Sequence, residues 1–180
     1  VKALHWGLVD IGVPALSKMT RFDANANLFT LPMFYGSDLS AVYAINDGPI
    51  GTALYQRMEE KTQTHMLGRS LDLGYTNLYT THRRVTNVDA VQTTHETLRS
   101  GQMWESGIRY CYEERSSYLG YVPLISLRTW NALAESDRQK ITAVWESIVD
   151  ESRLQAQRRQ QGARAELIQN GVEIFSDIEV

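Results

Sequence analysis

The stretch from Ser136 to Gly171 places the strongest constraint on the fold, because it has the pattern of one long helix. Ser136 and Gln139 have the spacing of a capping box, which predicts that the helix begins at Asp137. Apolar residues then recur at intervals of three and four, the pattern of a helix with one buried face: Ile141, Val144, Trp145, Ile148 and Val149. We therefore expect the first half of this helix to pack on a hydrophobic core.

The second half of the stretch is polar and ends at a stop signal. Arginine and glutamine occupy most of its positions, so this half is expected to be largely solvated. Gly171 fits a left-handed C-cap, which predicts that the helix ends at Asn170, and residues 172–175 alternate like a short strand. An unbroken helix over 137–170 would be about 50 Å long, with Gly162 as its weakest point. A rod of this length is expected to brace more than one part of the molecule.

The composition indicates an ordinary globular chain. It has 180 residues, of which 43% are apolar and 22% charged, which suffices for a substantial core. The net charge is −3 and the 18 Lys and Arg residues are scattered, which argues against a nucleic-acid-binding surface. Cys111 is alone, so no intrachain disulfide is expected, and no apolar run approaches the ~20 residues that cross a bilayer. The sequence begins at Val1, without an initiator Met or a leader, as expected of a processed or partial chain. The sequence therefore does not indicate the cellular compartment of the protein.

Helical and extended patterns alternate along the rest of the chain. Helices are predicted where apolar residues recur with a period near 3.6, at 1–8, 93–107 and 129–133, and as two short helices over 37–58 with a break at 46–49. Extended segments are predicted where apolar residues alternate or run together, at 9–13, 65–72, 74–79, 88–92, 108–112 and 118–126. This alternation favours the α/β class.

No arrangement of reactive residues indicates an enzyme. The four histidines are scattered, without the HExxH pair or another spacing of metal ligands: His5, His65, His82 and His95. The nucleophile elbow, the P-loop and the dinucleotide-binding glycine motif do not occur in the sequence. Cys111 stands between two tyrosines with no motif around it, as a buried, inert thiol would. We therefore expect no catalytic residue, no metal and no cofactor.

The polar and aromatic residues fit a ligand-binding site better than a catalytic site. In an extended segment Tyr75, Asn77 and Tyr79 share one face, where they offer an aromatic wall and an amide that both donates and accepts hydrogen bonds. The alternative is that the two tyrosines belong to a hydrophobic core. Phe34 follows Pro32 in a segment expected at the rim of a sheet, where it either covers a ligand or packs inside.

Six stretches, in order along the chain, resemble the substrate-binding receptors of tripartite ATP-independent periplasmic (TRAP) transporters. They are ALHWGLVDIGV at 3–13, FTLPMF at 29–34, DGPIGTAL at 47–54, LGRSLDLGYTN at 67–77, VDAVQ at 88–92 and YVPLISLRTWNAL at 121–133. The long charged helix followed by a short strand also has a counterpart in this family. Together these stretches span nearly the whole chain.

The resemblance implies an α/β fold of the two-lobed periplasmic-binding-protein type, incomplete in this chain. Two lobes joined by crossing strands would close on a ligand, and a long C-terminal helix would cross both. The first lobe would comprise residues 1–73, in part. Hinge strands and part of the second lobe would follow at 74–121. The chain would return to the first lobe at 122–180.

The resemblance also implies a ligand and a location. It places Gln92 and Thr93 at the end of a crossing strand, beside a ligand that Tyr75, Asn77 and Phe34 would also contact. The expected function is that of an extracytoplasmic receptor whose signal peptide has been removed. Such a receptor captures a small organic acid in the periplasm and delivers it to the membrane permease of a TRAP transporter, without chemistry of its own.

The chain departs from the family pattern at positions that bear on the ligand. The family has an arginine where this chain has Thr76. It also has a long segment, with the arginine that grips the ligand carboxylate, where Val85 and Val88 are almost adjacent here. The segments missing there and at the N-terminus either belong to a longer protein or are truly absent. No carboxylate-binding arginine can be named, because Arg83 and Arg84 are expected in a turn that faces water.

A second hypothesis follows from these departures. The chain would be a shortened relative that has lost the ligand site and acts as a helix-mediated interaction or structural protein. This second hypothesis would be favoured if the chain ran continuously through residues 85–88 and enclosed a complete core there. The sequence leaves open whether the long helix mediates a homodimer.

Overall fold

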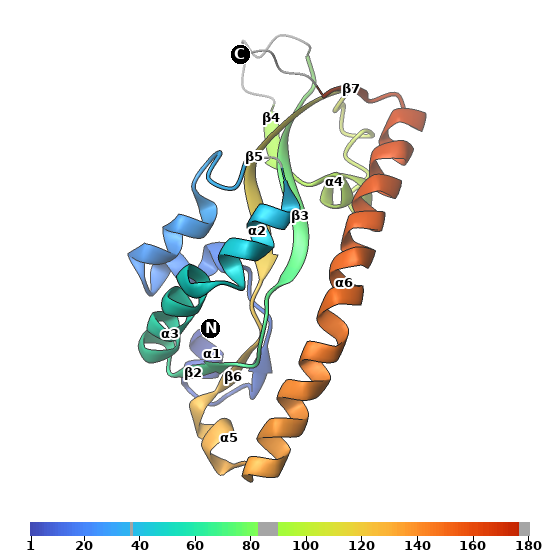
Figure 1. Ribbon diagram of the computed structural model, residues 1–180. Helices are drawn as coiled ribbons and strands as arrows, with labels where there is room; N and C mark the ends of the chain where they lie inside the picture. Colours follow the sequence, from blue (N-terminus) through green and yellow to red (C-terminus); the bar gives the residue numbers. More distant parts are fainter. Residues whose placement is uncertain (37, 83–89, 177–180) are drawn as a thin grey trace.

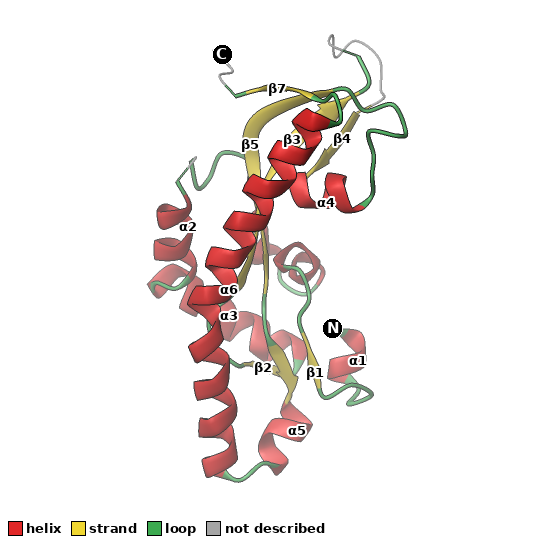
Figure 2. Cartoon of the chain, turned by 90° about the vertical axis from the view of Figure 1, so that its right-hand side faces the viewer, coloured by secondary structure: helices red, strands yellow, loops and turns green. Residues whose placement is uncertain are grey.

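The computed structural model describes residues 1–36, 38–82 and 90–176. The molecule is elongated, and one long helix, α6 (Glu135–Gln169), runs along its side from the lower end to the upper end (Figure 1). Two β-sheets follow each other along the length of this helix (Figure 2). The mixture of helices and sheets confirms the predicted α/β class.

The smaller sheet lies at the lower end, near the start of α6 (Figure 1). Its strands are antiparallel in the order β1–β6–β2, with bounds Ile11–Gly12 for β1, Leu124–Ser126 for β6 and Thr64–Met66 for β2. Two short helices lie beside it, α1 (Lys2–His5) and α5 (Leu127–Ala132). All three residues of the central strand β6 are buried, so this strand forms the centre of the lower lobe.

The larger sheet has four strands in the order β4–β3–β5–β7. Their bounds are Leu71–Thr80 for β3, Ala90–Thr93 for β4, Tyr110–Tyr121 for β5 and Glu173–Phe175 for β7. β3 and β5 are antiparallel partners of 10 and 12 residues, and they rise from the lower lobe into the upper one (Figure 1). These two long strands connect the two ends of the molecule. The two predicted segments 108–112 and 118–126 are therefore joined by β5, which continues through the charged residues between them.

Polar residues and proline fix the starts of the shorter helices. These helices are α2 (Leu39–Asn46), α3 (Pro49–Thr62) and α4 (His95–Ser100), with two 3-10 helices at Leu16–Arg21 and Ala24–Thr30. Asp38 accepts a hydrogen bond from the Ser40 amide (2.9 Å) and caps α2, and Thr94 caps α4. α4 is much shorter than the helix predicted over 93–107. It ends before Gln102, whose left-handed backbone (φ 47°) is incompatible with continuing the helix.

Two separate hydrophobic cores match the two ends of the molecule. The lower core lies under the helices of the first half and includes Leu4, Phe29, Val42, Met58, Tyr118 and Leu124. The upper core packs the larger sheet against α4 and the end of α6, and includes Tyr79, Leu98, Ile108, Cys111, Leu167 and Val172. The expected division at 1–73, 74–121 and 122–180 is compatible with this arrangement but remains a prediction.

Helix α6 is the predicted rod, but its start differs from the prediction. It is unbroken for 35 residues, and Gly171 takes the left-handed conformation (φ 82°) expected just beyond its end. It begins before Ser136, with Ala134 as N-cap and no capping side chain, so the predicted capping box is wrong. The side chain of Gln139 donates instead to Glu135 one turn earlier (3.1 Å). The helix follows closely on α5, which ends two residues before Ala134.

The buried face of α6 also differs from the prediction. Val144 and Ile148 are 64% and 45% exposed although they belong to the apolar stripe, whereas Val149 is fully buried. The second half, predicted to be largely solvated, buries Arg153, Ala156, Ala163 and Leu167. The reason is tertiary: this half packs against β3 and α4 and so supplies one wall of the upper lobe.

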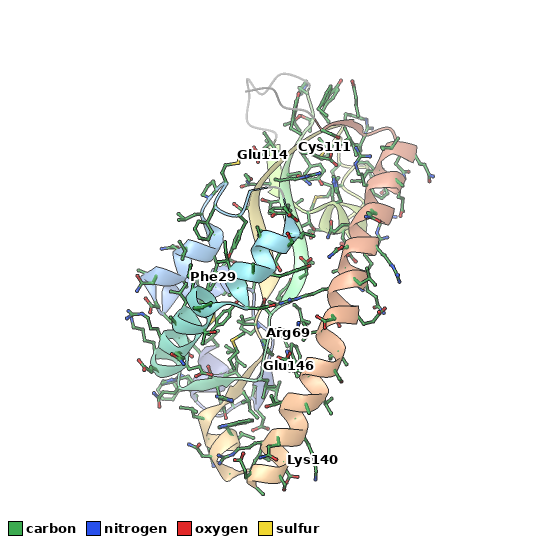
Figure 3. All side chains as sticks on the ribbon, viewed as in Figure 1. Phe29, Arg69, Cys111, Glu114, Lys140 and Glu146 are labelled. Atoms are coloured by element: carbon green, nitrogen blue, oxygen red, sulfur yellow. The ribbon has the colours of Figure 1, made fainter. Side chains whose placement is uncertain are left out.

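Polar contacts attach the first half of α6 to the segment between β2 and β3. The guanidinium of Arg69 forms ion pairs with Glu146 (2.7 Å) and Asp150 (2.7 Å), and Figure 3 shows Arg69 and Glu146 facing each other. The indole of Trp145 donates to the Arg69 carbonyl oxygen at 2.9 Å. Because its second half packs on β3 and α4, helix α6 contacts both lobes.

Candidate functional site

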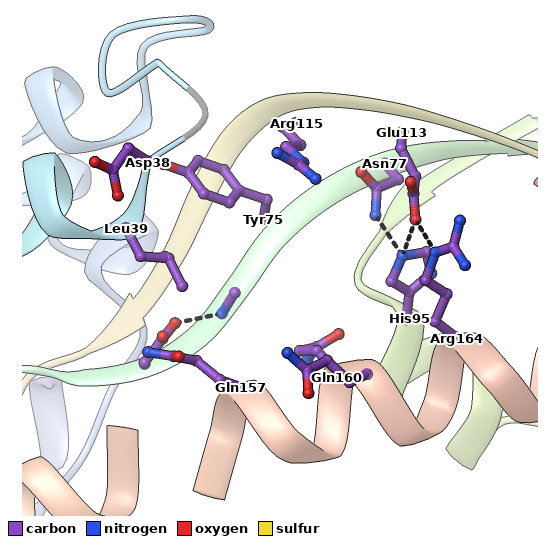
Figure 4. A pocket seen from close by; sticks show the side chains of 13 residues that line it. Asp38, Leu39, Tyr75, Asn77, His95, Glu113, Arg115, Gln157, Gln160 and Arg164 are labelled. Atoms are coloured by element: carbon purple, nitrogen blue, oxygen red, sulfur yellow. Dashed lines mark hydrogen bonds and ion pairs between the residues drawn. The ribbon is translucent and has the colours of Figure 1, made fainter. Parts of the chain in front are cut away.

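A cavity of about 400 Å³ lies between α6, β3 and the start of α2 (Figure 4). Thirteen residues line it: Asp38, Leu39, Asp72, Gly74, Tyr75, Asn77, His95, Glu113, Arg115, Gln157, Gln160, Gln161 and Arg164. β3 and β5 form one side of the cavity and α6 the other. Asp38 and Leu39 come from the lower lobe and His95 from the upper lobe, so both lobes contribute to the walls. Acidic, basic and amide side chains line the cavity together with apolar surface.

Tyr75 and Asn77, the two central residues of the predicted site, both line this cavity. Asn77 is 3% exposed, and its Oδ1 is enclosed without a hydrogen-bond partner among the described residues. The Tyr75 hydroxyl is likewise enclosed and unpartnered there, and burial raises the pKa of Tyr75 to about 12, so the phenol keeps its proton. Tyr79, the third residue of the predicted face, is fully buried in the upper core and reaches the site through His95.

Arg115 is the residue of the cavity that the sequence analysis missed. It is exposed, and it forms no ion pair or hydrogen bond within the described part of the chain. Its backbone is left-handed (φ 46°) at an irregular part of β5, where the pairing with β3 shifts between Thr76 and Leu78. Figure 4 shows its guanidinium between Tyr75 and Asn77. The available signal was an arginine within a charged run that interrupts an apolar strand pattern.

The charge of Glu113 is compensated, in contrast to that of Arg115. Its carboxylate accepts hydrogen bonds from Arg164 Nε (2.7 Å) and Ser176 Oγ (2.6 Å), and it contacts His95 Nε2 (3.0 Å; Figure 4). Burial opposes its ionisation, but the hydrogen bonds from His95, Arg164 and Ser176 outweigh burial and lower the pKa of Glu113 to about 2. Glu113 is therefore an anion at neutral pH that is already neutralised by the protein.

The end of the cavity nearest the lower lobe is built around Asp72. Burial raises the pKa of Asp72, while hydrogen bonds from the Tyr43 hydroxyl (2.7 Å) and the Gly74 amide (2.5 Å) act against this shift. Gln157 donates to Tyr43 (3.1 Å), and Gln160 donates to the carbonyl oxygen of Leu73 (2.7 Å). These contacts connect α6 to α2 and to β3.

The other predicted ligand residues lie outside the lining of this cavity. Gln92 is exposed on β4, where its amide contacts Glu114 and Ser116 on β5. Thr93 is 9% exposed at the end of the same strand. Phe34 packs edge-on against Tyr35 at 4.9 Å and contacts the lower core. The contact of these three residues with a ligand stays a prediction. Of the five predicted ligand residues, Tyr75 and Asn77 line the cavity together.

Thr76 stands where the resemblance places an arginine, and it is not among the residues that line the cavity. Its hydroxyl donates to the Ser117 carbonyl oxygen at 3.2 Å, and it is 5% exposed. The stretch between Val85 and Val88, where the family has a further segment, falls outside the described residues, as do Arg83 and Arg84. Across the described ranges no group of three or more His, Cys, Asp or Glu residues is arranged to hold a metal ion.

The fold is similar to solved structures of TRAP periplasmic solute-binding proteins. The protein from Sulfitobacter sp. NAS-14.1, with bound β-D-galacturonate, superposes with a TM-score of 0.89 at 18% identity, covering 98% of this chain and 72% of that one. The protein from Pseudomonas aeruginosa PAO1, with bound L-malate, gives 0.85 at 18% identity, with 97% and 75% covered. The protein from Shewanella oneidensis, with bound succinate, gives 0.84 at 18% identity, with 97% and 70% covered. These matches confirm the two-lobed fold, of which this chain spans a part.

Two further comparisons bear on the class of protein. No curated protein matches the sequence. Among the described helices, none is both long and apolar enough to cross a membrane. The sequence does match the family described as "Bacterial extracellular solute-binding protein, family 7", over residues 1–100 and 87–180. The chain therefore belongs to this family of extracytoplasmic solute-binding proteins, whose members are binding proteins and not enzymes.

Proposed function

We propose that this chain is the ligand-capturing part of a TRAP-type receptor, and that it binds a small organic acid in the cavity between α6 and β3. The observation that carries the proposal is Arg115, a cation that lines the cavity without an ion-pair partner in the described part of the chain. A guanidinium binds a carboxylate through two parallel hydrogen bonds. Arg115 would then replace the arginines that the family pattern leads one to expect and that this chain lacks.

The surroundings of Arg115 support the choice of an anion with hydroxyl groups. Tyr75 and Asn77 lie on either side of Arg115, with the Tyr75 hydroxyl turned towards Asp38 (Figure 4), and each residue has a polar atom that is enclosed without a partner among the described residues. Buried polar groups normally have hydrogen-bond partners, so a ligand with several oxygen atoms would complete this set. The volume of about 400 Å³ falls in the range of small-molecule sites.

The negative charges in the wall are largely occupied by the protein. Glu113 is neutralised by Arg164, and Asp72 accepts hydrogen bonds from Tyr43 and Gly74. Asp38 lies at the far end of the cavity, where it caps α2. A carboxylate next to Arg115 therefore meets an uncompensated positive charge at close range. Galacturonate, malate and succinate, which are bound in the structural relatives, are the acids to try first.

The finer parts of the function follow from the family and not from the cavity. We propose that the lobes close on the acid about β3 and β5, with the lobe limits expected from the sequence at residues 73 and 121. The loaded receptor would then deliver its ligand to the membrane permease of a TRAP transporter in the periplasm. Neither the cavity nor the family membership requires the homodimer through α6. The alternative of a helix-mediated interaction protein without a ligand predicts that no acid binds.

A thermal-shift screen tests the proposal. The purified chain is heated with uronates, C4-dicarboxylates and sugar acids, and each acid is paired with a neutral counterpart such as galactose for galacturonate. An acid at 100 times its dissociation constant should stabilise the fold by about 2.7 kcal/mol, or roughly 5–11 °C for a chain of this size. The neutral counterpart should give a much smaller shift. A folded chain that no acid stabilises would refute the proposed function and favour the interaction protein.

A further inference from the structure

We propose that Asn77 turns its amide nitrogen, and not its oxygen, towards a ligand in the cavity. Asn77 and Arg115 would then form a pair of donors for an acceptor group of the ligand, and the charge of Arg115 favours a carboxylate as that group. The statement about the ligand rests on the proposed function. The statement about the orientation of Asn77 rests on the hydrogen-bond network of His95, described below, and can be tested without any ligand.

The network begins with Glu113, which can only accept hydrogen bonds. Its side chain is 7% exposed and receives Arg164 Nε on Oε1 (2.7 Å) and Ser176 Oγ on Oε2 (2.6 Å). An arginine at this distance stabilises the carboxylate form, and a carboxylate has no proton to donate. The third contact of Glu113 is His95 Nε2, at 3.0 Å from Oε1. His95 Nε2 must therefore carry a hydrogen atom, which it donates to Glu113.

The other ring nitrogen of His95 faces a hydroxyl that can complete this assignment. Tyr79 Oη lies 2.6 Å from His95 Nδ1, and the Tyr79 side chain is fully buried. Burial raises the pKa of Tyr79 far above neutral pH, so the phenol keeps its proton and can donate it to Nδ1. The network therefore favours the neutral Nε2–H tautomer of His95. A doubly protonated ring would also carry a hydrogen on Nε2.

This assignment decides which end of the Asn77 amide can face His95. The structure has Asn77 Nδ2 at 3.3 Å from His95 Nε2, which would set an N–H group against another N–H group. The oxygen and nitrogen of an asparagine amide exchange places by a half-turn about one bond, and the hydrogen-bond network determines which is correct. With the oxygen at this position, Asn77 accepts a second hydrogen bond from Nε2–H. The half-turn thus removes an unfavourable contact between two donors.

The half-turn has a direct consequence for the ligand. It moves the NH2 group of Asn77 to the enclosed place where its amide now has no partner among the described residues. That place lies on the side of Arg115 (Figure 4). The NH2 group and the guanidinium of Arg115 are then two donors on the same side of Asn77, one of them charged, and a ligand group that accepts hydrogen bonds suits both. A ligand carboxylate, which can only accept hydrogen bonds, matches this pair, whereas it would repel an asparagine oxygen at the same place.

The orientation is tested first on the free protein by NMR. Long-range proton–nitrogen spectra of the ring distinguish a nitrogen that carries a hydrogen from a bare one, and a His95→Gln variant assigns the signals among the four histidines. The proposal predicts a hydrogen on His95 Nε2 between pH 6 and 8. A bare Nε2 would overturn it, because Asn77 would then donate to that nitrogen and its oxygen would face the ligand. This result does not depend on any acid binding.

The role of Asn77 in selectivity is tested by binding of galacturonate, or of the acid that gives the largest thermal shift. Asn77→Asp keeps the shape and the acceptor towards His95 but replaces the donor towards the ligand by an anion. Its affinity for the acid should fall roughly 100-fold or more, as expected when a charge-assisted hydrogen bond becomes a repulsion. Asn131→Asp, which adds the same charge on the exposed end of α5, should bind as the wild type does. Unchanged affinity in Asn77→Asp would overturn the assigned role, whereas absence of binding in the wild type would refute the proposed function itself.

Discussion

Replacing Arg153 by methionine should weaken the fold more than any other single change of a polar residue in α6. Arg153 has 5% of its side chain exposed and binds Asp47 through both oxygens, at 2.6 and 2.9 Å. Its Nε donates to the Ser70 carbonyl oxygen at 2.9 Å, and the guanidinium lies 4.3 Å from the centre of the Tyr43 ring. One side chain thus joins α6 to α2 and to the residue that precedes β3.

The magnitude follows from the groups left behind. Breaking a buried ion pair by removing one partner costs about 3–5 kcal/mol, because the other charge remains without compensation. The side chain of Asp47 is 21% exposed and can regain part of its hydration, which places the cost at the lower end, about 3 kcal/mol. For a chain of this size such a loss lowers the melting temperature by roughly 6–12 °C. Methionine preserves much of the apolar contact with Tyr43, so the loss reports on the polar contacts.

Urea denaturation followed by circular dichroism measures this loss as a change in the free energy of unfolding. Arg158→Met is the matched control, because Arg158 is exposed on the same helix and should change stability by no more than about 0.5 kcal/mol. Combining Arg153→Met with Asp47→Asn should cost less than the sum of the two single changes. The reasoning would be refuted if Arg153→Met and Arg158→Met were equally stable.

Three further predictions concern the pH dependence, the thiol and the end of α6. The pKa of Glu113 is lowered from 4.5 to about 2, so its stabilising effect is present above about pH 4.5 and lost as the pH falls towards 2. Denaturation at several pH values should therefore show a smaller loss of stability over that window in Glu113→Gln, and equal slopes would contradict this. Cys111 is fully buried and burial raises its pKa to about 12, so a thiol reagent should label it only after denaturation; rapid labelling of the folded protein would count against the structure. Gly171→Ala should cost about 1–2 kcal/mol of unfolding free energy, because φ is 82° there and alanine adopts this left-handed conformation unfavourably. No neighbour lies within 4 Å of the added methyl group, so a clash adds nothing to this cost. A neutral result would show that the C-cap relaxes.

Local sequence patterns predicted the features that depend on neighbours along the chain. The stop at Gly171 follows from the backbone that glycine alone adopts readily. The shared face of Tyr75 and Asn77 follows from the period of two in a strand, and both line the cavity. The sequence of alternating elements, together with the resemblance, indicated the two-lobed α/β fold. The alternative placement of the tyrosines also holds in part, since Tyr79 lies in the upper core.

The errors concern residues whose environment comes from distant parts of the chain. Arg153 looks solvated in the pattern of α6, and it is buried because Asp47, 106 positions away, supplies the opposite charge. Arg115 stands in a charged run, but this signal did not identify it as a cavity residue because its place in the cavity depends on an irregular pairing of β5 with β3. Val144 and Ile148 were expected to be buried, yet the docking of α6 on β3 leaves both at the surface. Periodicity identifies an apolar stripe, but the tertiary packing decides which part of it is covered.

Isothermal titration of this chain with galacturonate, or with the acid that gives the largest thermal shift, tests the central claim most directly. Three forms are compared: the wild type, Arg115→Met and the matched control Arg158→Met. Binding of the acid by the wild type and the control, with a loss of about 10–100-fold or more in Arg115→Met, is the result that the account predicts. Equal affinity in all three forms would show that Arg115 does not hold the carboxylate. Absence of heat in the folded wild type with every acid would contradict the receptor function itself.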